Sequence, residues 1–70
     1  MKVFVGINNG KIDFAKLYPR GKSESGNDLF VTSQGNWYSL TPGGRLRKVD
    51  IWIKDNKKIE TETYWTSTLI

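Results

Sequence analysis

The 70-residue chain contains no cysteine and no histidine. Without cysteine it can form neither a disulfide nor a thiolate metal site. Without histidine it lacks the commonest metal ligand, the commonest general base and every histidine-based catalytic triad. Its seven acidic residues stand in no recognisable pairing with a nucleophile or a metal ligand. We therefore expect no enzymatic activity, no metal and no cofactor.

Long apolar runs are also missing. No segment approaches the roughly 20 apolar residues of a membrane span. The N-terminal apolar run, Val3 to Ile7, includes a glycine and is too short for a secretory signal. With Met1 at its start, the chain reads as a complete small reading frame that forms one domain over residues 1–70. We expect a cytoplasmic protein that does not act at a membrane.

Positive charge is in excess, with eleven Lys+Arg against seven Asp+Glu and a net charge of +4. Residues 1–22 and 45–58 each carry +4, whereas residues 23–44 and 59–70 each carry −2. A basic domain rich in aromatic residues is suited to a DNA or RNA backbone, or to an acidic protein surface. Many small proteins carry a similar charge for solubility alone.

Residues 45–58, RLRKVDIWIKDNKK, contain the clearest strand pattern. Val49, Ile51 and Ile53 alternate with polar residues and Trp52, which predicts a half-buried strand with Trp52 facing outward. A three-residue loop over 55–57 is preferred, because a one-residue slip would send every side chain to the wrong face. The expected pairs are Ile53 with Ile59, Ile51 with Thr61, Val49 with Thr63, Trp52 with Glu60, Asp50 with Glu62 and Lys48 with Tyr64.

Two further hairpins precede this one. Asn9-Gly10 predicts a type I′ turn between a strand over 2–7 and one from residue 11 to about 17 or 18. This turn pairs Ile7 with Ile12 and Val5 with Phe14. Pro19 is expected to end the second strand, because it cannot donate a ladder hydrogen bond, and residues 20–28 then form a long polar loop.

The next two strands are predicted over 29–32 and 37–40. A two- or four-residue loop between them pairs Val31 with Tyr38, Leu29 with Leu40, Thr32 with Trp37 and Phe30 with Ser39. Both faces of this hairpin carry aromatic residues, so it could be covered on both sides. The breaker TPGG over 41–44 follows it.

Three consecutive hairpins predict an all-β antiparallel domain of about six strands. We expect a small barrel of SH3-like or OB-like size, or a strongly twisted sheet. No internal repeat is expected beyond the hairpin itself. Trp37-Tyr38 and Tyr64-Trp65 are adjacent aromatic pairs, and one ring of each pair is expected in the core.

Two short segments combine glycine with cations: YPRGK over 18–22 and TPGGRLRK over 41–48. Such segments could hold phosphates, although a solubilising loop and a solvated strand explain them equally simply. Trp52, flanked by Lys48 and Lys54, could stack on bases, but acidic residues are expected on the same face. The candidate binding residues are Arg20, Lys22, Arg45, Arg47, Lys48, Trp52 and Lys54.

Three functions remain open. The first is a nucleic-acid-binding β module with phosphate contacts that are not sequence-specific and with aromatic stacking, for which four to six phosphates give a salt slope of about −3 to −5. The second is a regulatory or inhibitory protein-binding module, including a viral accessory protein, that uses a strand edge or the Trp52 surface. The third is a subunit that assembles with its own copies through strand edges. Convergence of residues 18–22 and 45–48 into one positive patch beside an exposed ring would favour the first, whereas their placement on opposite sides would remove most of its support.

Overall fold

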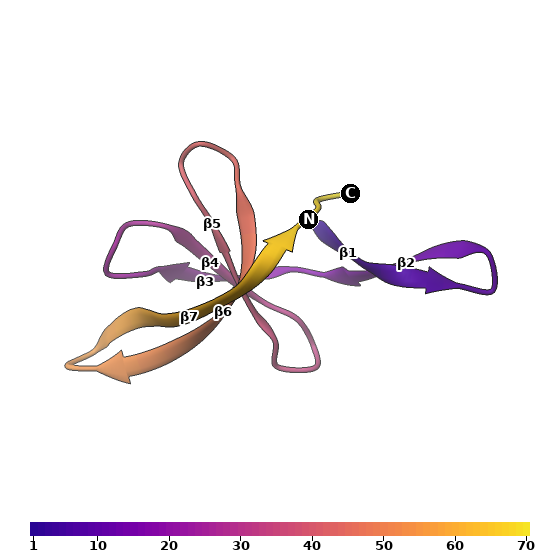
Figure 1. The fold of residues 1–70 in the computed structure, drawn as a ribbon. Coiled ribbons are helices and arrows are strands. Elements are labelled where there is room, and N and C mark those ends of the chain that lie inside the picture. The colour runs from indigo at the N-terminus through magenta and orange to yellow at the C-terminus, as the bar shows by residue number, and fades with distance from the viewer.

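The computed structural model describes all 70 residues and contains strands but no helix (Figure 1). The strands are β1 (Lys2–Asn8), β2 (Lys11–Lys16), β3 (Tyr18–Lys22), β4 (Asp28–Val31), β5 (Trp37–Leu40), β6 (Leu46–Lys54) and β7 (Lys57–Ser67). They form an antiparallel pair, β1–β2, and an antiparallel five-stranded sheet in the order β3-β4-β5-β6-β7. The strands of the larger sheet fan out in Figure 1 because each is rotated against its neighbour. The predicted all-β antiparallel fold is confirmed.

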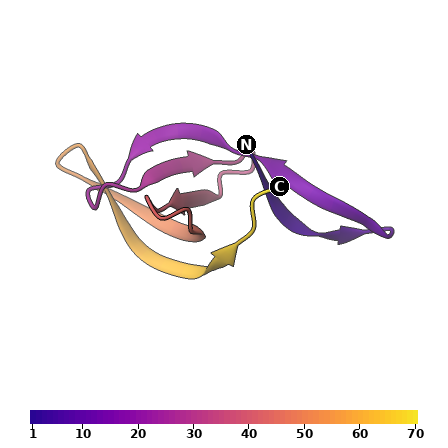
Figure 2. The same ribbon diagram turned by 90° about the horizontal axis from the view of Figure 1, so that it is seen from above.

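The five-stranded sheet is not closed into a barrel, because its edge strands β3 and β7 do not pair. The start of β1 lies near both edges instead. At the β2–β3 junction, the Leu17 N–H donates to the Met1 carbonyl at 2.8 Å. On the other side of β1, the Phe4 N–H donates to the Thr68 carbonyl at 2.9 Å, and Leu69 bridges to Val3. The two chain ends therefore lie side by side (Figure 2).

The apolar core is small and lies where β1 meets the larger sheet. It consists of Val3, Leu17, Phe30, Tyr38 and Leu46, none more than 7% exposed. Only 11 of the 70 residues are buried, so we expect a modest stability at the lower end of the roughly 5–15 kcal/mol of ordinary domains. A single lost core contact is therefore a large fraction of the total.

The first hairpin has the predicted turn but a different register. Asn9 and Gly10 have φ values of 51° and 74°, as a type I′ turn requires, and Ile7 pairs with Ile12. The predicted pairing of Val5 with Phe14 is wrong. A β-bulge leaves Val5 without a partner, and Phe14 pairs with Phe4.

The predicted polar loop over residues 20–28 is also wrong in its first part. Residues 18–22 form β3, which pairs with β4 at the edge of the sheet. Pro19 is tolerated there because an edge strand has one side without ladder hydrogen bonds. A register shift between Pro19 and Lys22 marks an irregularity in this strand.

Three turns of the larger sheet share one construction, which amounts to an unexpected internal repeat. They begin at Ser23, Thr32 and Thr41, nine residues apart, with the sequences SESGN, TSQGN and TPGGR. In each, the first residue accepts a bond at its carbonyl from the glycine N–H three positions on, and its hydroxyl accepts one from the next N–H. The glycines Gly26, Gly35 and Gly44 have φ between 86° and 90°. This is a type I turn followed by a left-handed residue.

The repeated turn explains why the predicted β4–β5 register is wrong by one residue. Its tip contains three residues, whereas an even number was expected. Phe30 therefore pairs with Tyr38, and Leu29 with Ser39. All four are buried, so the hairpin is covered on both faces, as its composition suggested.

The β6–β7 hairpin closes with a two-residue turn, not the expected three-residue loop. Asp55 and Asn56 both have positive φ, 52° and 61°. Bulges at Thr61 and Tyr64 then shift the register twice. The predicted pairs of Val49 with Thr63 and Asp50 with Glu62 are present, whereas those of Lys48, Ile51, Trp52 and Ile53 are wrong.

The tip of the β6–β7 hairpin extends past the end of β5, so the burial that the sequence predicts along β6 is found only at its start. Val49 is 1% exposed and Ile51 is half-buried, but Ile53 near the tip is 61% exposed. The core therefore covers only the first half of this strand.

Candidate functional site

One face of the β6–β7 hairpin carries exposed rings and lysines. Trp52 is 55% exposed, which confirms the predicted outward orientation. The Lys54 ammonium lies 5.5 Å from its ring centroid. Lys48 precedes Trp52 by four residues on β6. Its ammonium lies 4.7 Å from the Tyr64 ring centroid and 5.2 Å from the Trp65 ring centroid. We call this set, Lys48, Trp52, Lys54, Tyr64 and Trp65, the aromatic strip.

Tyr64 and Trp65 both belong to the surface, so the expectation that one of them is in the core is wrong. They are 44% and 57% exposed, with ring centroids 5.9 Å apart. Neighbours on a regular strand point to opposite faces, but the bulge at Tyr64 interrupts the alternation. The other pair follows the expectation, because Tyr38 is buried and Trp37 is half-buried on the opposite face. Burial raises the pKa of Tyr38.

A cleft of about 600 Å³ adjoins the inner end of the aromatic strip. Trp65 and Lys48 line it from β6–β7, Phe4 from β1, and Gln34 and Asn36 from the turn after β4. A second cleft of about 390 Å³ lies on the β2 side and shares four lining residues with the first. The shared residues are Val5, Gln34, Asn36 and Tyr38. The two clefts are therefore neighbours, and rings, amides and an ammonium line the one beside Trp65.

Acidic residues interrupt the positive charge of the aromatic strip. Asp50 and Glu62 pair across the two strands between Lys48 and Trp52. The Tyr64 hydroxyl donates a hydrogen bond to Asp50. This hydrogen bond, together with the negative charge of both carboxylates, raises the pKa of Tyr64 to about 12. The face is therefore of mixed charge, as the sequence indicated.

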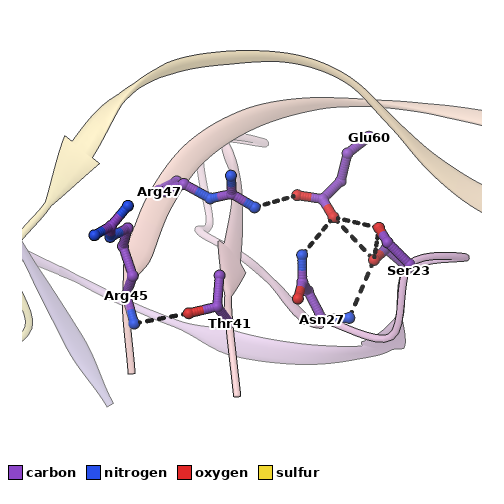
Figure 3. Close-up of polar contacts among 7 residues, drawn as sticks. Ser23, Asn27, Thr41, Arg45, Arg47 and Glu60 are labelled. Atoms are coloured by element: carbon purple, nitrogen blue, oxygen red, sulfur yellow. Dashed lines mark hydrogen bonds and ion pairs between the residues drawn. The ribbon is translucent and has the colours of Figure 1, made fainter. Parts of the chain in front are cut away.

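Arg47, one of the predicted binding residues, points away from the aromatic strip. It follows Leu46 and precedes Lys48 on β6, so its side chain lies on the opposite face. There its guanidinium lies 3.4 Å from a Glu60 carboxylate oxygen, and the two side chains are 28% and 11% exposed (Figure 3). This arginine is engaged inside the fold.

Glu60 connects β7 to the turn between β3 and β4. Its second carboxylate oxygen accepts hydrogen bonds from the hydroxyls of Ser23 at 2.9 Å and Ser25 at 3.1 Å, and from the Asn27 amide at 2.9 Å (Figure 3). The Glu24 N–H also donates to a backbone carbonyl of β7, at Lys58. These contacts join parts of the chain more than thirty residues apart, so no local pattern could reveal them.

The surroundings of Glu60 favour its ionised form. Burial alone would raise its pKa, but the nearby Ser39 hydroxyl and the hydrogen bonds from Asn27, Ser23 and Ser25 outweigh burial and lower the pKa. The Ser39 hydroxyl is buried and makes no hydrogen bond of regular geometry, so we attribute most of the lowering to the other three donors.

The remaining predicted cations do not join the aromatic strip. Lys22 pairs with Asp28 at 2.9 Å, and Arg20 bonds to the neighbouring Pro19 carbonyl. Lys22 also lines a polar cavity with Lys57 and Lys58. The structure thus places Lys22, at the end of β3, beside the β6–β7 turn.

Arg45 lies in the turn before β6, and its side chain points away from Glu60 (Figure 3). Of the two basic segments, only Lys48 lies on the aromatic strip. The segments therefore do not form a single positive patch, which counts against phosphate binding through these two segments. The cations beside Lys22 are Lys57 and Lys58.

The chain matches no protein-family model, no curated protein and no solved structure. The fold includes no helix suited to crossing a membrane. No group of three or more acidic side chains is placed to hold a metal ion.

Proposed function

We propose that the chain binds single-stranded nucleic acid along the aromatic strip, without sequence specificity. The observation that carries the proposal is the pairing of each exposed ring group with a lysine: Lys48 with Tyr64 and Trp65, and Lys54 with Trp52. Bases stack on such rings, and the ammonium groups neutralise the phosphates that follow the bases.

The dimensions of the strip suit an extended strand. Lys48 and Trp52 are four residues apart on β6, which corresponds to about 13 Å along a β-strand. Trp65, which pairs with Lys48, and Trp52 therefore offer two stacking sites with Tyr64 beside the first. The cleft next to Trp65 adds the amides of Gln34 and Asn36, which can donate to or accept from a base edge.

Alanine substitution of the rings tests the proposal. Loss of one base–aromatic stack typically costs about 1–3 kcal/mol, so Trp65→Ala or Trp52→Ala should weaken binding of a fluorescent single-stranded oligonucleotide by about 5-fold to 160-fold at low salt. Ile53→Ala, which changes an equally exposed residue on the opposite face of β6, is the matched control. Absence of binding to DNA and RNA at low salt, or equal losses in all three variants, would contradict the proposal.

The mixed charge of the strip favours a second candidate, a protein-binding regulatory or inhibitory module. Asp50 and Glu62 lie between the lysines, and Trp52 and Ile53 are both exposed near the hairpin tip. Exposed aromatics within a mixed polar rim are typical of protein interfaces. A partner that survives nuclease treatment of a lysate and is lost with Trp52→Ala would favour this candidate over the first.

A further inference from the structure

The outer face of the β1–β2 hairpin is apolar, and the rest of the chain covers it only in part. Phe4 pairs with Phe14 and Ile7 pairs with Ile12, so these four side chains share one face. They are 39%, 45%, 71% and 62% exposed. We call them the apolar face of the hairpin. The opposite face packs into the core through Val3, which is fully buried.

The bulge at Val5 makes the apolar face continuous. Side chains alternate along a regular strand, so Phe4 and Ile7, three positions apart, would otherwise point to opposite faces. The extra residue shifts the alternation by one and brings both to the same face. None of the four side chains of this face is buried, so the arrangement contributes little to the core of a single copy.

Charge is confined to the rim of the apolar face. Lys2 and Lys16 pair at its base, and the Lys2 ammonium lies 4.3 Å from the Phe14 ring centroid. The turn at the tip, Asn9-Gly10, is neutral. Lys11 and Asp13 fall on the opposite face by the alternation of β2.

The area of the apolar face allows a weak specific interface. If each side chain offers about half of a typical 200 Å², the four together expose roughly 400 Å². Two facing copies would bury about 800 Å², which is below the roughly 1,200 Å² of stable specific interfaces and within the range of weak, transient encounters. A two-stranded hairpin is also only marginally stable unless its faces are packed.

We propose that two copies of the chain associate through their apolar faces, with the hairpins antiparallel about a two-fold axis. The Phe4 and Phe14 rings of one copy then cover Ile7 and Ile12 of the other, and the reciprocal contact is identical, as a two-fold interface requires. The lysines at each base meet the neutral turn of the other copy, so no like charges face each other. The dimer face and the proposed nucleic-acid site share Phe4, which also lines the cleft beside Trp65.

Sedimentation velocity of the intact chain between micromolar and millimolar concentration tests the dimer without any nucleic acid. We expect a monomer–dimer equilibrium whose dissociation constant rises at least about tenfold in the double variant Ile7→Thr/Ile12→Thr, which keeps β-branched residues in both strands. Ile53→Thr is the matched control, because Ile53 is 61% exposed on the other hairpin, and it should leave the equilibrium unchanged.

A chain that stays monomeric up to millimolar concentration would overturn the dimer. A dimer that the double variant leaves intact would overturn it as well, because such a dimer must use strand edges or another surface. The absence of cysteine allows a second measurement, which reports the orientation of the two copies through disulfides formed with oxidised glutathione as the oxidant. A mixture of Ile12→Cys and Phe14→Cys copies should form mixed disulfides in preference to either like pair, and a preference for like pairs would contradict the antiparallel arrangement.

Discussion

Two hairpins project from opposite ends of the molecule and carry different surfaces (Figure 1). Both β1–β2 and β6–β7 close with a two-residue turn of positive φ, and both contain bulges. In β1–β2 the bulge at Val5 gathers apolar side chains on one face. In β6–β7 the bulge at Tyr64 leaves two adjacent rings exposed beside Lys48. The position of the bulge, more than the alternation of residue types, decides which chemistry each hairpin presents.

The two hairpins are also anchored differently. β1–β2 is held by an apolar contact, the burial of Val3 in the core. β6–β7 shares this core through Leu46 and has in addition a polar anchor, the bonds of Glu60 to Arg47 and to the turn after β3. The first anchor depends on packing and the second on charge, so the two should respond differently to substitution and to pH.

Removal of either anchor should give the largest loss of stability. Val3→Ala should cost about 2–3 kcal/mol through the cavity that it leaves. Glu60→Ala should cost about 3 kcal/mol, because it leaves Arg47 and three hydrogen-bond donors without their partner. Urea unfolding measures both. Glu24→Ala, which removes an exposed ion pair with Lys57, is the control and should cost less than about 0.5 kcal/mol. An equal effect of Glu60→Ala and Glu24→Ala would mean that the polar anchor is not structural.

Acid should weaken only the polar anchor. The pKa of Glu60 is lowered from its ordinary value of 4.5, so its contribution is fully present above that value and is lost as the pH falls through the lowered pKa. Urea unfolding between pH 7 and pH 3 should therefore show a smaller acid loss in Glu60→Gln than in the natural chain. Val3→Ala should keep the acid loss of the natural chain. Superimposable profiles for Glu60→Gln and the natural chain would contradict this assignment.

Substitution of one turn residue should raise the stability of the chain in the β6–β7 hairpin and lower it in the β1–β2 hairpin. Asn56 has a φ of 61° without being glycine, so Asn56→Gly should stabilise the chain by up to about 1 kcal/mol. Gly10 has a φ of 74°, so Gly10→Ala should destabilise it by about 1 kcal/mol. Thermal unfolding of the two variants measures both changes. A loss of stability in Asn56→Gly would show that the Asn56 side chain contributes more than its strained backbone costs.

The smallest expected effect is on the pKa of Tyr64, whose hydroxyl contacts Asp50 on the face of mixed charge. Its pKa of about 12 follows from the hydrogen bond to Asp50 and the two nearby carboxylates. The stability that this contact contributes is present below the ordinary phenol value of 10 and is lost as the pH rises through about 12. Absorbance titration should show a lower pKa in Asp50→Asn, with a smaller shift in Glu62→Gln. No change in Asp50→Asn would exclude the hydrogen bond in solution.

The sequence predicts the strands well because each rests on a local pattern. Asn9-Gly10 specifies its turn, and the alternation along β6 places Trp52 outward together with Lys48 and Lys54. The strand registers depend on bulges. Each bulge adds one unpaired residue, and the alternation of apolar and polar residues does not predict where it occurs. The nine-residue repeat is visible in the sequence as a Ser or Thr followed three residues later by glycine. A search for repeated apolar positions does not find it.

The candidate site could be predicted only in part. Arg47 looks like a phosphate ligand until its partner Glu60 is known, and that partner comes from the neighbouring strand. The Ser23 turn that completes the contact is 37 positions from Glu60. Tyr64 and Trp65 were visible as adjacent rings, but their joint exposure depends on a bulge. The partner of Arg47 and the exposure of Tyr64 and Trp65 therefore depend on strand pairing between distant residues, which local sequence patterns do not predict.

The most direct test is the salt dependence of binding to one single-stranded oligonucleotide. It is compared between two double variants, each of which lacks two lysines of one hairpin. Each phosphate contact contributes about 0.7 to the slope of log K against log salt for a single strand. We predict that Lys48→Ala/Lys54→Ala reduces the magnitude of the slope by about 1.4, whereas Lys2→Ala/Lys11→Ala on the β1–β2 hairpin leaves it nearly unchanged. Equal reductions in the two double variants, or a larger one from Lys2 and Lys11, would contradict the assignment of binding to the aromatic strip.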